Sequence, residues 1–186
     1  MSALGDTLSA VAAVLDARRL RWYVFGAQAV AVRGAPRATQ DVDITVEVDR
    51  SELESVVADL DAAGIRHRYP EIADDLLASG AVLPMRHGSG MELDLVVAGP
   101  GLEQLALSRA ERIEIDAVSV PVAHATDLVV MKVLAGRGKD LEDLRSLLSA
   151  GGVDVDEARD LISQLESALG QSDLLPILDA ALDEVR

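Results

Sequence analysis

The sequence predicts an α/β (α+β) fold, with a short mixed sheet flanked by helices and a helical C-terminal region. Three observations support this prediction. Apolar and polar residues alternate with period two over residues 41–48, which is typical of a half-buried β-strand. Aromatic and β-branched residues over 22–25 run into a glycine, and small, helix-compatible residues follow over 27–32. Apolar residues recur at helical spacing in two further segments, 155–169 and 174–185.

The remaining elements of the core follow in chain order. Apolar residues at helical spacing over 8–15 predict an amphipathic first helix. Residues 51–54 (Ser-Glu-Leu-Glu) have the pattern of a capping box and predict the start of another helix. Alternating apolar and acidic residues predict a strand over 91–97, and two more strands are expected on either side of a turn at residues 116–117.

Helix-terminating signals mark the C-terminal part of the chain. Thr126 is expected to cap a helix that ends near Gly136, and Gly138 separates this helix from the next. We therefore divide the chain into a core, residues 1–124, and a helical region, residues 125–186, that packs on the core. Because aromatic residues make up only 2% of the 186 residues, the core is expected to be aliphatic.

Two aspartates, Asp41 and Asp43, are the most informative residues of the chain. They share one face of the predicted strand, because side chains on a strand alternate between faces. Two neighbouring carboxylates repel unless a cation lies between them, and a hard cation such as Mg²⁺ prefers oxygen ligands. The alternative is a solvated strand face. A second Asp-x-Asp, residues 154–156, opens a helix and instead supplies N-cap and first-turn residues.

The strand predicted over 91–97 offers further carboxylates. Glu92 and Asp94 share one of its faces, and Asp94 lies between two leucines, so that it needs a partner if it is buried. A two-metal site commonly takes a third carboxylate from a neighbouring strand. Asp94 is the candidate, and Glu92 is the less favoured one or an outer support. An edge strand with polar outer side chains is the alternative explanation.

A phosphate-binding turn is expected just before Asp41. Gly26 lies where a strand passes into a helix, and a glycine there lets a phosphate approach the backbone. The N-terminus of the helix adds free N–H donors and the positive end of the helix dipole. A basic loop over residues 33–39 then leads into the Asp-x-Asp strand. The expected phosphate and metal sites are therefore consecutive in the chain.

A family resemblance rests on three strings: Phe25-Gly26-Ala27-Gln28-Ala29, Arg33-Gly34 and Arg37-Ala38-Thr39-Gln40-Asp41-Val42-Asp43. The order of glycine, spacer and Asp-x-Asp resembles the signature of the nucleotidyltransferase superfamily of the DNA polymerase β type. The longer pattern resembles a bacterial branch that includes AbiEii-type abortive-infection proteins and related small nucleotidyltransferases. The resemblance covers residues 22–148. Ala27 departs from this signature, which usually has Gly or Ser at the same position. The hydroxyl of a serine there helps to hold a phosphate, and Ala27 lacks it, but backbone N–H groups remain available.

The resemblance implies a nucleotidyltransferase fold and a two-metal site for Mg²⁺. The metal ligands and catalytic residues it implies are Asp41, Asp43 and Asp94. The nucleotide-binding residues it implies are Gly26, Ala27, Arg37 and Lys132.

Lys132 is included because residues 127–144 resemble a stretch of the same branch, Lys-x-x-Ala-x-Arg-x-Lys-Asp-x-x-Asp-Leu. In that branch the first lysine of the stretch approaches the nucleotide phosphates. The alternative for this stretch is purely structural, because Lys139 and Asp143 have the spacing of an ordinary helical ion pair. We expect a structural role for four of its charged residues: Arg137, Lys139, Asp140 and Asp143.

The implied reaction transfers a nucleoside monophosphate from an NTP to an acceptor hydroxyl. A tRNA, a protein and a small molecule such as an aminoglycoside all remain open as acceptors. The AbiEii resemblance further implies a toxin-like enzyme with a separately encoded antitoxin protein as partner. The competing hypothesis is a non-catalytic module of this fold that binds a nucleotide or a protein. Ala27 and the acidic charge favour that module, whereas the three aspartates argue against it.

Charge and composition narrow the choice of partners. The net charge of −15 makes the chain a poor general binder of nucleic acid. The charge is nevertheless uneven, because residues 1–90 carry 9 basic and 13 acidic side chains whereas residues 91–186 carry 8 and 19. We expect a local basic rim around the site that is able to hold a nucleotide or a tRNA end. The absence of cysteine excludes disulfides and zinc–thiolate sites. Because the sequence has no membrane-length apolar run and no basic leader, we expect a cytoplasmic protein without a membrane partner. The arginines and histidines of the first half include Arg18, Arg19, Arg21, Arg33, Arg37, Arg66, His67, Arg68, Arg86 and His87.

Overall fold

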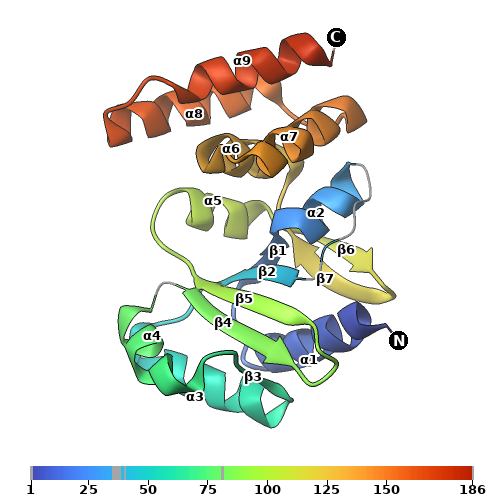
Figure 1. The fold of residues 1–186 in the computed structure, drawn as a ribbon, viewed down its shortest axis with the longest axis vertical. Helices are drawn as coiled ribbons and strands as arrows, with labels where there is room; N and C mark the ends of the chain where they lie inside the picture. Colours follow the sequence, from blue (N-terminus) through green and yellow to red (C-terminus); the bar gives the residue numbers. More distant parts are fainter. Residues whose placement is uncertain (1, 35–38, 40, 81, 186) are drawn as a thin grey trace. The chain divides into compact units, whose positions relative to one another are not determined.

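The computed structural model describes residues 2–34, 39, 41–80 and 82–185 (Figure 1). These residues form a mixed α/β fold with a single seven-stranded sheet, which confirms the predicted fold class. The chain divides into two compact units: the first comprises residues 1–28 and 38–123, and the second comprises residues 29–37 and 124–186. The packing of a helical region on the core stays a prediction.

The sheet belongs to the first unit, and its order is β3-β4-β5-β2-β1-β7-β6. β2 runs antiparallel to β1 on one side and parallel to β5 on the other. β1 and β7 are also parallel, whereas the β3–β4, β4–β5 and β6–β7 pairs are antiparallel. The Asp-x-Asp strand β2 is therefore the central strand. The strands are β1 (Trp22–Phe25), β2 (Asp41–Val46), β3 (Ile65–His67), β4 (Val82–His87), β5 (Glu92–Val97), β6 (Glu111–Ile115) and β7 (Val118–Val122).

The alternating pattern of β2 separates an apolar face from an acidic one. Val42 and Ile44 are fully buried, whereas Asp41 and Asp43 are half-buried on the other face. β5 repeats this arrangement, with its leucines buried and its acids half-buried. The apolar faces of both strands contribute to the core, and their acidic faces are partly accessible to a ligand.

Helices of the first unit cover the apolar side of the sheet. Figure 1 shows α1 (Ala3–Ala17) and α3 (Arg50–Ala62) on the same side, where each buries an apolar stripe. The short helices η1 (Pro70–Ile72) and α4 (Ala73–Ser79) connect β3 to β4, and α5 (Leu102–Arg109) connects β5 to β6. The buried side chains of α1 and α3 include Leu8, Val11, Leu15, Leu53, Val56 and Leu60.

The second unit is helical. It contains α6 (Ala125–Ala135), α7 (Gly138–Ala150), α8 (Val155–Leu169) and α9 (Leu174–Glu184), together with the end of α2 (Gly26–Arg33). The Asp154 carboxylate accepts a hydrogen bond from the Glu157 N–H at 2.9 Å, which confirms that Asp154 caps α8. Among the described residues, no helix has both the length and the apolarity to cross a membrane.

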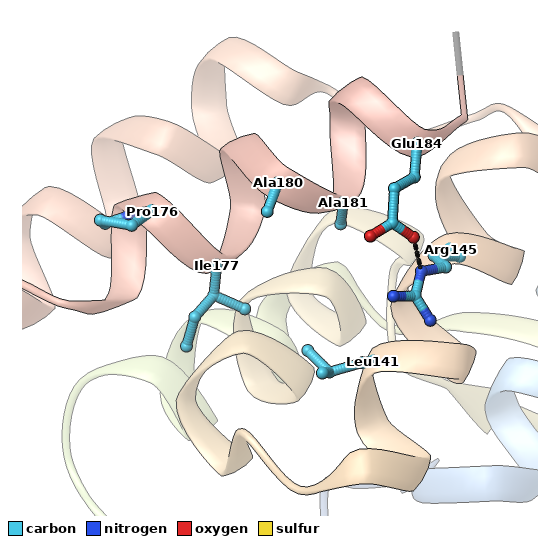
Figure 2. Close-up of a pocket in the computed structure, with 7 residues that line it drawn as sticks. All are labelled: Leu141, Arg145, Pro176, Ile177, Ala180, Ala181 and Glu184. Carbon is cyan, nitrogen blue, oxygen red and sulfur yellow. Dashed lines mark ion pairs between the residues drawn. The ribbon is translucent and has the colours of Figure 1, made fainter.

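A pocket of about 280 Å³ lies between α7 and α9 of this unit (Figure 2). Its lining is mostly aliphatic, with Leu141 and Ile177 on facing helices, and an ion pair between Arg145 and Glu184 closes one end. None of the predicted site residues lines this pocket.

Two predicted helix starts are wrong by two residues each. α3 begins at Arg50 with Asp49 as its N-cap, so Ser51 lies inside the first turn and the expected capping box does not form. His124 caps α6 by accepting from the Thr126 N–H at 3.3 Å, which moves the start of this helix ahead of Thr126. In both places the residue two positions before the predicted cap is the last one with an extended backbone, and it occupies the N-cap position instead.

The turn between β6 and β7 agrees with the prediction. Asp116 and Ala117 both have positive φ angles, 50° and 64°, as a tight two-residue hairpin turn requires. Strands β3 and β4 and helices α4 and α5 were not predicted from the sequence.

Candidate active site

The acidic residues of β2 and β5 lie side by side on one face of the sheet. In the parallel register of these strands, Asp43 is opposite Asp94 and Asp41 is opposite Glu92. All four point away from the buried apolar side chains, because side chains alternate along each strand. The structure thus brings together the three aspartates that the sequence singled out, and their roles as metal ligands and catalytic residues stay a prediction.

Gly26 contacts the Asp43 carboxylate closely. Phe25, the last residue of β1, pairs with Asp43, and α2 begins at the next residue. Gly26 has a φ angle of 64°, and a Cβ atom at this position would lie 1.8 Å from Asp43 Oδ2. Only glycine accommodates both this backbone conformation and this approach. Ala27 follows in the first turn of α2 and is buried.

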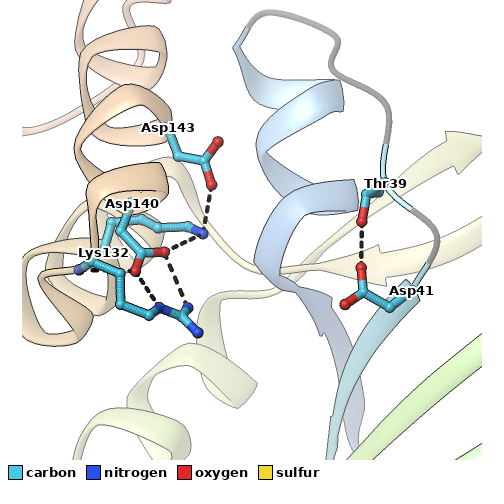
Figure 3. Close-up of polar contacts among 6 residues, drawn as sticks. Thr39, Asp41, Lys132, Asp140 and Asp143 are labelled. Carbon is cyan, nitrogen blue, oxygen red and sulfur yellow. Dashed lines mark hydrogen bonds and ion pairs between the residues drawn. The ribbon is translucent and has the colours of Figure 1, made fainter.

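The other aspartate of β2 is held by the residue two positions before it. The Thr39 hydroxyl donates a hydrogen bond to Asp41 Oδ1 (Figure 3). This contact fixes the orientation of the carboxylate at the start of β2. Arg37, one of the predicted nucleotide-binding residues, lies outside the described residues.

Arg68 holds the acids of β5. It donates from Nη2 to Asp94 Oδ1 and from Nη1 to Glu92 Oε2, the second at 2.5 Å. The backbone N–H of Arg68 donates to Pro84 O at 2.9 Å, which fixes this residue against β4 just after the end of β3. Arg86 of β4 contacts the other oxygen of Glu92 at 2.6 Å. From the sequence, Arg68 is only one of the basic residues of the first half, because its contacts depend on two strands that were not predicted.

The two acids of β5 differ in pKa. Burial raises the pKa of the Asp94 carboxyl; Arg68 opposes this effect, and the charges of Asp41 and Glu92 add to it. The hydrogen bond from Arg86 lowers the pKa of Glu92, against a smaller effect of desolvation, and Arg68 lowers it further. The charged form of Asp94 is therefore the less favourable of the two, and Asp94 gains more from a nearby cation.

The three aspartates fit a hard divalent cation in the chemistry of their donor atoms. They offer only carboxylate oxygens from neighbouring strands, and the effect of Asp41 on the pKa of Asp94 is a repulsion that a cation would relieve. Within the part of the chain that the structure describes, no three His, Asp or Glu side chains are already grouped as ligands around one point. Because Arg68 pairs with Asp94, binding of a cation requires these side chains to reorient.

Lys132 lies in the second unit, on α6, and its side chain is buried. Its Nζ contacts Asp143 Oδ2 at 2.7 Å and Asp140 Oδ1 at 3.1 Å (Figure 3). Arg137 Nε contacts the second oxygen of Asp140 at 2.6 Å. This buried network agrees with a structural role for the two aspartates, while the nucleotide-binding role of Lys132 stays a prediction.

The chain matches a protein family over residues 6–173, and this family is described as nucleotidyltransferase of unknown function (DUF6036). The protein therefore belongs to this nucleotidyltransferase family. No curated protein matches the chain. The predicted superfamily is thereby confirmed.

Solved structures of antibiotic-modifying proteins are similar in fold. The solution structure of the antibiotic-resistance factor ANT(2'')-Ia is 19% identical, with 91% of this chain and 95% of that chain covered and a TM-score of 0.55. A crystal structure of ANT(2")-Ia in complex with adenylyl-2"-tobramycin is 16% identical, with coverages of 87% and 96% and a TM-score of 0.56. The lincomycin-bound lincosamide antibiotic adenylyltransferase LnuA is 14% identical, with coverages of 78% and 96% and a TM-score of 0.51. The chain thus has the fold of these proteins.

Proposed function

We propose that the protein is a metal-dependent nucleotidyltransferase that moves a nucleoside monophosphate from an NTP to an acceptor hydroxyl. The observation that carries this proposal is the pairing of Asp43 with Asp94 on adjacent parallel strands, with Gly26 against Asp43 at the start of α2. Membership of a nucleotidyltransferase family supports this reaction class. The fold shared with the lincosamide antibiotic adenylyltransferase LnuA, and with ANT(2")-Ia in complex with adenylyl-2"-tobramycin, supports it as well.

Asp41 and Asp43 are the residues proposed to hold the Mg²⁺ that accompanies the triphosphate. Bound metal would neutralise charge on the attacking and leaving oxygens. The backbone N–H groups of Gly26 and Ala27, at the N-terminus of α2, are the proposed donors to phosphate oxygens. Thr39 keeps Asp41 oriented toward this role through its hydrogen bond to Oδ1.

Asp94 is proposed to accept the proton of the acceptor hydroxyl. The oxygen of that hydroxyl then attacks the α-phosphorus, the bond from this phosphorus to the β-phosphate oxygen breaks, and pyrophosphate leaves. The raised pKa of Asp94 suits a proton acceptor better than that of an ordinary exposed aspartate. Arg68 is a positioning residue, because it acts on the reaction only by holding Asp94 and Glu92.

The class of molecule that accepts the nucleotide is a separate part of the proposal. The AbiEii-type resemblance favours a toxin-like enzyme with an antitoxin protein as partner. Similarity to proteins bound to adenylyl-tobramycin and to lincomycin favours a small-molecule acceptor. A tRNA or a protein hydroxyl is compatible with the same site chemistry.

One observation favours a second candidate function, a non-catalytic module that binds a nucleotide or a protein. Arg68 neutralises Asp94, the residue on which proton transfer depends. If Arg68 never releases this carboxylate, the fold binds a ligand without transferring a nucleotide.

The deciding experiment incubates the protein with Mg²⁺, a cell extract and NTPs labelled on either the α- or the γ-phosphorus. Nucleotidyl transfer moves the α-label to the acceptor and leaves the γ-label in pyrophosphate. The Asp43→Asn variant serves as the inactive control. Bound but untransferred NTP, with every nucleotide and every fraction of the extract, would establish the non-catalytic module instead.

A further inference from the structure

A second pocket, with a polar lining, lies next to the acids of β5, at the edge of the sheet formed by β3 and β4. Its volume is about 500 Å³, which is large enough for a small ligand. The charged and titratable residues of its lining are Arg66, His67, Arg68, Arg86 and His87, and we call it the arginine pocket. Two of its residues, Arg68 and Arg86, also contact Glu92, so this pocket adjoins the proposed active site.

Two of the arginines are directly opposite each other. Arg66 of β3 and Arg86 of β4 are register partners, so they lie on the same face of the sheet. Like charges at directly opposite positions destabilise an antiparallel pair. The ion pairs that offset this repulsion, Arg66 with Asp61 and Arg86 with Glu92, are solvent-exposed and therefore weak. An anion between the two guanidinium groups would relieve this repulsion.

Two residues that line the pocket, His67 and Arg68, have buried nitrogen atoms. Among the described residues, Arg68 Nε and both ring nitrogens of His67 are buried without a hydrogen bond. Burial lowers the pKa of His67, against an opposing effect of the Asp61 charge, and so favours the neutral ring, which carries one N–H donor and one acceptor. Unsatisfied buried donors are costly, and a bound acceptor group removes that cost.

The second histidine presents a donor as well. The Ser89 N–H donates to His87 Nδ1 at 3.2 Å, so in the neutral ring the proton resides on Nε2. This Nε2 lies beside Gly64, 3.8 Å from where a Cβ atom would be, so a small residue keeps that side of the ring open. Guanidinium and imidazole groups of β3, β4 and Arg68 thus line one pocket, and both kinds of group can donate hydrogen bonds to an oxyanion.

We propose that the arginine pocket binds a phosphate group of the acceptor, so that the molecule that receives the nucleotide is anionic. Guanidinium groups recognise phosphate oxygens through paired, charge-assisted hydrogen bonds, and Arg66 and Arg86 are exposed enough to exchange their present partners for it. A cationic aminoglycoside is repelled by the same residues. The identification of the ligand as an acceptor rests on the proposed nucleotidyl transfer, whereas the binding of phosphate does not.

The three histidines of the chain allow a local test. His67 and His87 line the arginine pocket, and His124 caps α6 in the second unit. The ring signals of all three are followed by NMR at constant pH and ionic strength while inorganic phosphate is added. We expect the His67 and His87 signals to move to saturation and the His124 signal to stay. No movement up to about 20 mM phosphate would overturn the proposal, because a few charge-assisted bonds should give a Kd of about 1 mM.

Variants make the test specific. The double variant Arg66→Gln, Arg86→Gln should weaken phosphate binding about tenfold or more, since each charge-assisted hydrogen bond contributes ~1.5–3 kcal/mol. Arg112→Gln is the matched control, because Arg112 is an exposed arginine of β6 paired with Asp16, outside the pocket. Equal binding by the double variant and the control would overturn the assignment.

Two further experiments identify the molecule that carries the phosphate and test whether its binding affects nucleotidyl transfer. Ribose 5-phosphate and a single-stranded RNA hexamer are compared in the same titration, and the tighter ligand identifies a small metabolite or a nucleic-acid strand. The α-label assay is then run with the double variant. A raised KM for the acceptor with unchanged NTP affinity supports the proposal. Transfer to tobramycin that the double variant does not affect overturns the acceptor assignment and leaves the proposed function intact, whereas phosphate binding without any transfer overturns only the proposed function.

Discussion

The Asp43 carboxylate occupies the space that a side chain on Gly26 would need. Glycine at this strand-to-helix turn is therefore required by the acidic site itself, in addition to any phosphate that approaches the backbone. The same contact connects the end of β1 to the central strand of the sheet.

Gly26→Ala should disturb both the fold and the site. The methyl group overlaps Asp43 Oδ2, and the positive φ angle is strained for alanine. We expect a loss of about 1–3 kcal/mol in the free energy of unfolding, measured in urea. Gly99→Ala is the control, because Gly99 has no positive φ and the added Cβ would meet its nearest atom at 3.9 Å. A Gly26→Ala variant as stable as this control would show that Asp43 adopts another position.

Asp43→Asn should weaken metal-dependent nucleotide binding severely. Asparagine keeps the shape of the side chain but removes the charge that attracts a hard cation. Calorimetric titration of Mg²⁺ or Mn²⁺ in the presence of NTP measures the effect. Asp156→Asn is the matched control, since it changes the second Asp-x-Asp, which lies in the first turn of α8. Equal metal binding by both variants would refute the site assignment.

Asp94→Ala should separate binding from chemistry. Asp41 and Asp43 remain to hold the metal and the triphosphate, so NTP affinity should change little. Transfer to the acceptor should fall by several orders of magnitude, as expected when an interaction exists only in the transition state. Single-turnover kinetics together with equilibrium NTP binding measure the two effects. If transfer survives, the role of proton acceptor moves to Glu92.

Lys132→Met should destabilise the helical unit. The substitution leaves two buried carboxylates, those of Asp140 and Asp143, without their shared cation. Removing one partner of a buried ion pair typically costs about 3–5 kcal/mol, which urea unfolding followed by circular dichroism would detect. Lys139→Met, at an exposed position of α7, should be nearly neutral. A small effect of Lys132→Met would instead support a role for this lysine in binding alone.

The pH dependence of stability should reveal Asp140. Burial alone would raise its pKa, but hydrogen bonds from Arg137 and Lys132 outweigh burial, and the pKa is lowered. A carboxyl whose pKa is lower in the folded state contributes stability above its unfolded pKa of about 3.9, and this stability is lost as the pH falls through the folded value. The Asp140→Asn variant should therefore lose less stability than the wild type on acidification from about pH 5 to pH 2. Parallel curves for the two proteins would contradict this expectation.

Local patterns predicted both acidic strands. Alternation over β2 and β5 depends only on neighbouring residues, so each strand and the face that carries its acids followed from the sequence. That the two strands are neighbours was expected only from the third carboxylate that a two-metal site needs, and the register of β2 with β5 comes from the structure. The hairpin turn at residues 116–117 followed in the same way.

Arg68 could not be predicted because its role depends on contacts that are distant in sequence. β3 is only three residues long and largely polar, and β4 contains Pro84, which argues against a strand. Without these two strands, nothing in the sequence places Arg68 next to Asp94 or Arg66 opposite Arg86. The contacts of Lys132 with two aspartates of the next helix could not be predicted for the same reason, because they depend on how α6 and α7 pack.

Helix α2 has a practical consequence for work with fragments of this protein. Its first three residues, Gly26–Gln28, are assigned to the first unit, and the rest of the helix is assigned to the second. Ala29 and Val30 are fully buried, and Gly34 lies close to Ser146 of α7. A fragment that stops at Ala123 would keep every described strand but would expose the apolar second half of this helix. Such a truncation should give an aggregation-prone product, so sheet and helices are better expressed as one polypeptide and dissected by point substitution.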